Sequence, residues 1–197
     1  MKERTTSLRP RARSGVVDAL GFAWAHPVPV AGATLLTAGA RFLQAGWSDA
    51  LPTGASLALE LVVLAGRVGL VLIALGEGHL GRGIQAVRGA LAQPERAGEA
   101  WVARLVEQAR RRWRPLAGDA AALLVIVVLL NGLIDDLAGF APVLAWVSAL
   151  VDTREAAPSA TVLLLKNGTV IPLVILVQVR VVMLLAGAAR PVAGAGA

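Results

Sequence analysis

The chain has 197 residues, of which 56% are hydrophobic and 16% are charged, with no cysteine and a formal net charge of +6. Soluble domains carry about 25% charged residues, so this composition excludes an ordinary globular protein and indicates a single domain lying mostly in a bilayer. The absence of cysteine excludes disulfides, thiolate metal sites and cysteine nucleophiles. Because the basic residues flank apolar segments, we predict anionic lipid headgroups as their partner, and no nucleic acid.

The first third of the chain predicts a basic flank, a surface helix and one span. Residues 1–15 hold five basic residues and one acid, which is typical of a cytoplasmic flank. Residues 16–25 are mostly apolar and contain Trp24, so we expect a short interfacial helix there. The first span is expected over residues 29–45, with Arg41 about one turn from its far end.

A second span is expected over residues 57–76, and it contains two charges, Glu60 and Arg67. Their spacing of seven places them on about the same helix face but two turns apart, too far for the usual three- or four-residue salt bridge. Each of these charges therefore needs a partner from another part of the protein or from another chain.

Residues 77–115 hold eight arginines and four glutamates, which predicts a cytoplasmic loop. From Glu95 onward, apolar residues recur at helical spacing, so we expect an amphipathic helix on the membrane surface. It ends in a basic patch that we expect to lie on anionic headgroups, formed by Arg110, Arg111, Arg112 and Arg114. Docking of an acidic partner on these arginines is the alternative.

The third span is expected over residues 116–134, where Asp119 is the only charge. The weaker apolar run 137–151 is short and contains Pro142, so a re-entrant or interfacial helix is expected, and a fifth crossing is the alternative. The last span, 165–187, contains Arg180. We expect it to be broken near its outer end, because Lys-Asn-Gly at 166–168 and Pro172 interrupt it.

Together these segments predict an all-α, polytopic membrane bundle: one membrane domain over residues 1–197 with four spans and cytoplasmic N- and C-termini. The positive-inside bias supports this topology, because the N-terminal flank and the 77–115 loop hold 13 of the 19 Lys and Arg residues. We therefore expect a multi-pass protein of the plasma (inner) membrane.

Depth along the spans predicts which charges meet. Arg180 and Asp119 fall toward the inner side and are expected to pair. Arg41, Glu60 and Lys166 fall toward the outer side and are expected to form a cluster around Glu60. Arg67 is left without an acidic partner in the chain, which is costly for an arginine at mid-bilayer.

No catalytic, nucleotide-binding or metal-binding motif is recognisable, so we expect a protein that is not an enzyme and has no cofactor. Two functions remain. In the favoured one the protein is a structural or accessory subunit, whose intramembrane charges pair within the bundle or with other membrane protein subunits. The alternative is an oligomeric small-solute transporter or channel, whose broken helices form an outer polar site from Asp135, Asp136, Lys166 and Asn167.

Overall fold

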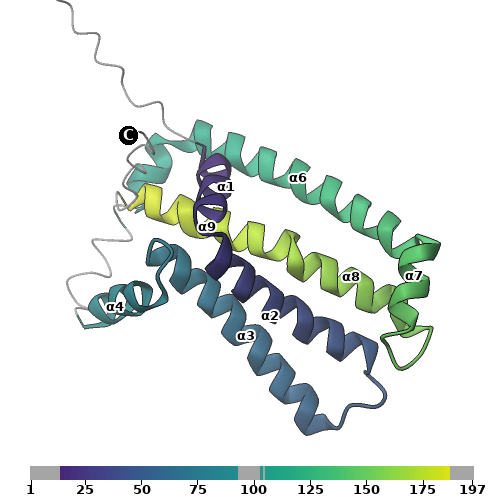
Figure 1. Ribbon diagram of the computed structural model, residues 1–197. Helices are drawn as coiled ribbons and strands as arrows, with labels where there is room; N and C mark the ends of the chain where they lie inside the picture. The colour runs from purple at the N-terminus through teal and green to yellow at the C-terminus, as the bar shows by residue number, and fades with distance from the viewer. Residues whose placement is uncertain (1–13, 93–102, 104, 187–197) are drawn as a thin grey trace, which may run out of the picture.

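The computed structural model describes residues 14–92, 103 and 105–186, and within these residues every regular element is a helix (Figure 1). An all-α fold is therefore confirmed for this part of the chain. The helices, in chain order, are α1 (Gly15–Ala25), α2 (Pro27–Gly46), α3 (Thr53–Leu75), α4 (Leu80–Leu91), α6 (Trp113–Gly139), α7 (Ala141–Ser148), α8 (Ala156–Gly168) and α9 (Val170–Leu185).

Three helical segments are long and apolar enough to cross a membrane: α3, α6 and the consecutive pair α8 and α9. A fourth segment qualifies only if α1 and α2 are taken together as one span, and these two helices are bent by 97° relative to each other. The structure thus supports a membrane protein with three or four spans. The expected first span, 29–45, lies within α2, which passes this test only in combination with α1.

The spanning helices are held together mainly by α2 and by the α8–α9 segment. Figure 1 shows α2 running between α3 and α8, while α6 lies on the other side of the α8–α9 segment. Helix α7 joins α6 to α8 at one end of the bundle, and α1 crosses α9 near the opposite end. The end that carries α1 also carries α4, the start of α6 and the end of α9.

The hydrophobic core lies at the end of the bundle where α1 crosses. The sharp turn before Pro27 directs the apolar residues of α1 onto α9, which also packs on α3. As a result, the core combines residues from three helices that are distant in sequence: Val16, Ala19, Phe22, Leu70, Ile73, Ala74, Leu176 and Val177.

Two expected interruptions differ in the structure. Helix α8 continues through Lys166 to Gly168, and only Thr169 separates it from α9. Pro172 lies in the first turn of α9, where backbone N–H groups have no intrahelical partner, so its missing donor costs little. The expectation of a helix unwound at 166–168 is therefore wrong: the break is one residue long.

Helix α6 extends to Gly139, so Asp135 and Asp136 lie inside it and not in a connection. The next helix, α7, has eight residues and is about 12 Å long at ~1.5 Å per residue, compared with about 30 Å for a hydrocarbon core. A fifth crossing at this position is excluded by length, in agreement with the expected short helix.

Helix α4 is a feature that the sequence interpretation missed, because residues 77–94 were assigned to a loop without a helix. Within it, Gly83 packs directly against the carbonyl oxygen of Leu72, leaving no room for a side chain. The expected amphipathic helix from residue 95 lies partly outside the described residues, although residues 105–111 are helical. The N-terminal flank and the C-terminal tail also lie outside them.

Candidate functional site: charged residues within the bundle

The Arg180 side chain is only 1% exposed, although arginine keeps its positive charge in proteins. Its Nε donates a hydrogen bond to Oδ2 of Asp18 at 2.5 Å, and its Nη1 donates one to Oε1 of Glu77 at 3.0 Å. The ring of Phe22 lies 5.2 Å from the guanidinium carbon, within the range of a cation–π contact. We call Asp18, Phe22, Glu77 and Arg180 the Arg180 cluster.

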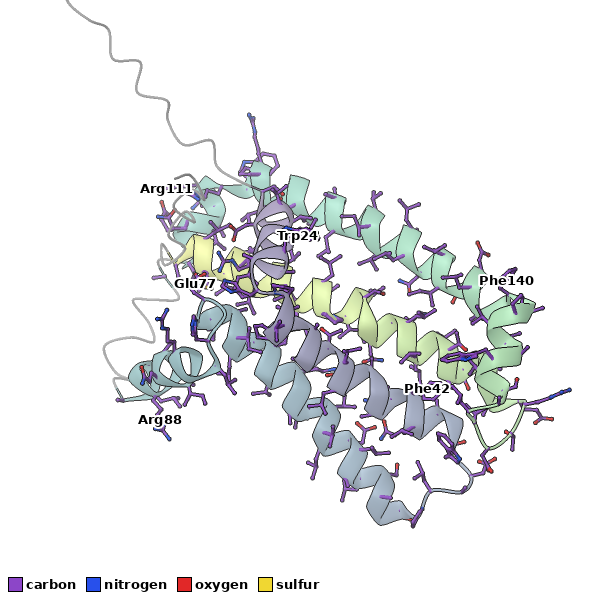
Figure 2. All side chains as sticks on the ribbon, viewed as in Figure 1. Trp24, Phe42, Glu77, Arg88, Arg111 and Phe140 are labelled. Atoms are coloured by element: carbon purple, nitrogen blue, oxygen red, sulfur yellow. The ribbon has the colours of Figure 1, made fainter. Side chains whose placement is uncertain are left out.

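Two local structures bring the acids to Arg180. Asp18 lies in the first turn of α1, where a negative charge is favoured by the helix dipole. Glu77 lies in the turn between α3 and α4 with φ of 49°, which is uncommon for a residue other than glycine. Gly78 follows with φ of 87° and packs against the ring of His26. Figure 2 shows Glu77 beside α9, at the end of the bundle that also carries Arg111.

The expected pair between Arg180 and Asp119 is wrong. Asp119 instead accepts hydrogen bonds from the hydroxyl of Ser14 and from the backbone N–H of Gly15, the latter at 2.7 Å. It therefore binds the N-terminus of α1, where backbone N–H groups have no partner within the helix. The physical reason is the position of α1, which supplies an acid to Arg180 and hydrogen-bond donors to Asp119.

Sequence reasoning missed Asp18 and Glu77 as members of the site. A signal was present, since Asp18 is the only charged residue in the segment 15–25. Glu77 is the first charged residue after Arg67 and ends the apolar run.

At the other end of the bundle, Arg41 lies between α2 and α3. Its Nη1 is 2.5 Å from Oε1 of Glu60 and 2.9 Å from Oε1 of Gln44. The side chain of Glu60 remains 49% exposed and that of Arg41 24%. Lys166 does not join this pair; its Nζ lies 4.0 Å from Oδ1 of Asp135 instead. The structure thus brings two of the three expected outer charges together.

Arg67 projects from α3 toward α8, where its Nη2 donates to Oδ1 of Asn167 at 3.2 Å. Asn167 is 1% exposed, and its own amide nitrogen donates to the carbonyl of Leu163 at 2.8 Å, which fixes the orientation of the amide. The Nε of Arg67 is buried and has no hydrogen-bond partner among the described residues. Within the same residues, no carboxylate forms an ion pair with Arg67.

The four residues of the expected outer polar site do not meet at one place. Lys166 and Asn167 are neighbours on a helix and so project about 100° apart, Lys166 toward Asp135 of α6 and Asn167 toward Arg67 of α3. Asp136 is exposed and forms no ion pair with another described residue. A shared solute site would need these groups to converge, which they do not.

The basic patch lies at the start of α6 and just before it, and its four arginines are exposed. Arg111 pairs with Glu107 at 2.7 Å on the same helical turn, and Arg114 lies 5.5 Å from the centre of the Trp113 ring. Exposed pairs of this kind stabilise a protein little, so the arginines remain available to other anions.

Two grooves on the bundle are lined by apolar side chains. One, of about 560 Å³, lies between α1, α2, α6 and the α8–α9 junction; the other, of about 450 Å³, lies between the outer halves of α2 and α3. Neither groove is lined by an ionisable side chain, so neither offers a charged solute a partner.

Comparison with protein-family models, with curated proteins and with solved structures gives no match to this chain. The site must therefore be interpreted from its own chemistry.

Proposed function

We propose that this protein is a non-catalytic, multi-pass protein of the plasma (inner) membrane that acts as a structural or accessory subunit of a larger membrane complex. The observation that carries the proposal is Arg67, a partly buried arginine with one amide partner and a buried, unpaired Nε among the described residues. An arginine at mid-bilayer costs about 2.5 to 3.5 kcal/mol on insertion scales. A carboxylate from a neighbouring subunit would compensate the charge of Arg67 at the part of its side chain that remains exposed.

The pair of Arg41 and Glu60 supports the same proposal. Glu60 is seven residues into α3, about 10 Å along the helix from Thr53, and half of its side chain is exposed. Ionisable groups within spans almost always face a protein interior or a water-filled cavity. A neighbouring helix that covers this surface would give Glu60 such an environment.

The transporter alternative receives less support, for two reasons. Its proposed site does not converge, because Asn167 is held by Arg67 and Lys166 faces α6. The two large grooves are apolar, so they suit hydrocarbon chains better than a polar solute.

The experiment is co-purification of the tagged protein from its own membranes in mild detergent, comparing Arg67→Leu with a control. Arg154→Leu is a suitable control, because Arg154 is an exposed arginine in the α7–α8 connection. We expect Arg67→Leu to lose membrane partners that Arg154→Leu retains, while the isolated Arg67→Leu chain stays at least as stable as the unaltered protein. Retention of every partner, together with loss of uptake of an anionic solute, would replace this proposal by the transporter.

The orientation proposed is with both termini and the basic patch in the cytoplasm. It is supported by the separation of charge, since Arg82, Arg88 and the basic patch lie at one end of the bundle. The chain lacks cysteine, so single cysteines at Gln85 and Ser48 can be labelled selectively. An impermeant reagent added outside intact cells should label position 48 and not position 85, and the reverse pattern would overturn the topology.

A further inference from the structure

Helix α4 is exposed on nearly all of its surface. Of its twelve residues, only Gly83 is buried and only Val87 is of intermediate exposure, while the other ten are exposed. Helices of this length are marginal in water even when rich in alanine, and α4 contains three glycines, each less favourable than alanine by about 1 kcal/mol. A helix with so little packing and such weak propensity needs a further surface to hold its conformation.

The apolar residues of α4 form one continuous face. Leu80, Ile84, Val87 and Leu91 recur at the three- and four-residue spacing of a helix stripe. Leu80, Ile84 and Leu91 are respectively 47%, 37% and 73% exposed. The described residues therefore cover this face only in part, most at Val87 and Ile84 and least at Leu91.

The charges of α4 indicate what covers that face. The helix contains Arg82 and Arg88 and no acidic residue. At 100° per residue, Arg88 borders the apolar stripe and Arg82 lies on the opposite side. Arg88 therefore lies close to a surface touched by the stripe, whereas Arg82 lies about one helix diameter, 10–12 Å, from it, beyond the Debye length of about 8 Å. Figure 2 shows Arg88 pointing away from the bundle.

The position of α4 is set by the end of a span. Only four residues, 76–79, connect it to α3, so its first turn cannot leave the membrane surface by more than about 14 Å. The turn itself is well defined, because Gly83 packs on the Leu72 carbonyl and Gly78 donates to the carbonyl of Ile73 at 2.9 Å. Helix α4 is thus held in place beside the bilayer before any partner binds.

We propose that α4 is an amphipathic membrane-surface helix, whose apolar stripe inserts at the level of the headgroups and whose arginines select an anionic leaflet. The occupant of the exposed face is the lipid bilayer. A short apolar stripe, arginines without acids and attachment to a span suit α4 to this role, whether or not the protein is a subunit of a complex.

The test places the full-length protein in nanodiscs of neutral phosphatidylcholine, with or without anionic phosphatidylglycerol. Four variants each carry a fluorophore on a single cysteine in α4. Positions 84 and 91 lie on the apolar stripe, and positions 85 and 89 are their respective controls on the other side of the helix. Doxyl-labelled lipid quenches from the bilayer, and iodide quenches from water. We expect doxyl quenching to be stronger at 84 and 91 than at 85 and 89, and to increase when anionic lipid is present.

The contribution of charge is tested with Arg88→Glu, matched by Arg154→Glu in the connection at the opposite end of the bundle. Each arginine near an anionic surface contributes about 1 kcal/mol, so removing one shifts the docked equilibrium roughly fivefold, and reversal shifts it further. Arg88→Glu should therefore reduce doxyl quenching at 91 in anionic discs, whereas Arg154→Glu should leave it unchanged.

Three results would overturn the proposal. Equal quenching by iodide at all four positions would mean that α4 lies in water. Equal doxyl quenching in neutral and anionic discs would remove the role assigned to the arginines. Protection of 84 and 91 from both quenchers would mean that protein, and not lipid, covers the apolar face.

Discussion

Asp18 and Arg180 are expected to contribute to stability as a unit, whereas Asp119 and Arg180 are expected to act independently. The test compares three single variants, Asp18→Ala, Asp119→Ala and Arg180→Met. Two double variants combine Arg180→Met with Asp18→Ala or with Asp119→Ala. The cluster geometry predicts coupling only in the first pair, because Asp18 touches Arg180 and Asp119 binds the N-terminus of α1.

The magnitude follows from burial. Removing one member of a buried ion pair costs about 3 to 5 kcal/mol, since the other charge remains uncompensated. Asp18→Ala leaves Arg180, which is 1% exposed, with Glu77 as its remaining acid, so we expect a cost near the lower limit. The loss should largely disappear when Arg180 is already Met, giving a coupling energy of about 1 to 3 kcal/mol. The Asp119 and Arg180 variants should add to within about 0.5 kcal/mol.

The assay is reversible unfolding of the purified chain in one detergent, followed by circular dichroism. For a chain of this length, 1 kcal/mol corresponds to roughly 2–4 °C in Tm. Asp18→Ala should therefore lower Tm by about 6 °C or more. Additive effects of Asp18 and Arg180 together with strong coupling of Asp119 and Arg180 would refute the assignment of partners.

Two further predictions concern packing between the spans. Gly66→Ala should lower the free energy of unfolding by about 1 to 3 kcal/mol, because a Cβ there collides with the hydroxyl of Thr37. Gly69→Ala is the control: its Cβ meets no neighbour, so the variant should be neutral or stabilising by up to about 1 kcal/mol. Equal effects of the two variants in detergent unfolding would contradict the close contact of α2 and α3. Asn167→Leu should destabilise the isolated chain by at least about 1 kcal/mol, since Arg67 loses its hydrogen bond to the Asn167 amide. Adding Arg67→Leu to Asn167→Leu should recover part of that loss. Full stability of the single Asn167→Leu variant would show that this hydrogen bond contributes nothing.

Local sequence pattern was sufficient to predict the helical class and the approximate position of most spans. A span is specified by about 20 consecutive apolar residues, and this information lies within one stretch of chain. The expected spans 57–76 and 116–134 correspond to α3 and α6, with helix ends that differ by up to five residues. The short helix after α6 was also predictable, because the apolar run 137–151 is short for a crossing and contains Pro142.

Features that depend on close contact were not predictable in the same way. Helix α4 forms despite its glycines, and within it Gly83 allows the backbone to approach Leu72, although glycine composition alone argues against a helix there. The break at Thr169 is one residue long, because Pro172 falls in the first turn of the next helix and needs no donor.

The choice of charge partners was decided by tertiary structure. Sequence position gives the depth of a charge in a straight span, and by depth alone Asp119 is the natural partner of Arg180. The 97° bend between α1 and α2 turns α1 across the end of the bundle and brings Asp18 to Arg180 over a separation of 162 residues. The sequence by itself therefore determined that buried charges needed partners, because charge is costly in hydrocarbon. The direction of one short helix, α1, determined which partners Arg180 and Asp119 obtained.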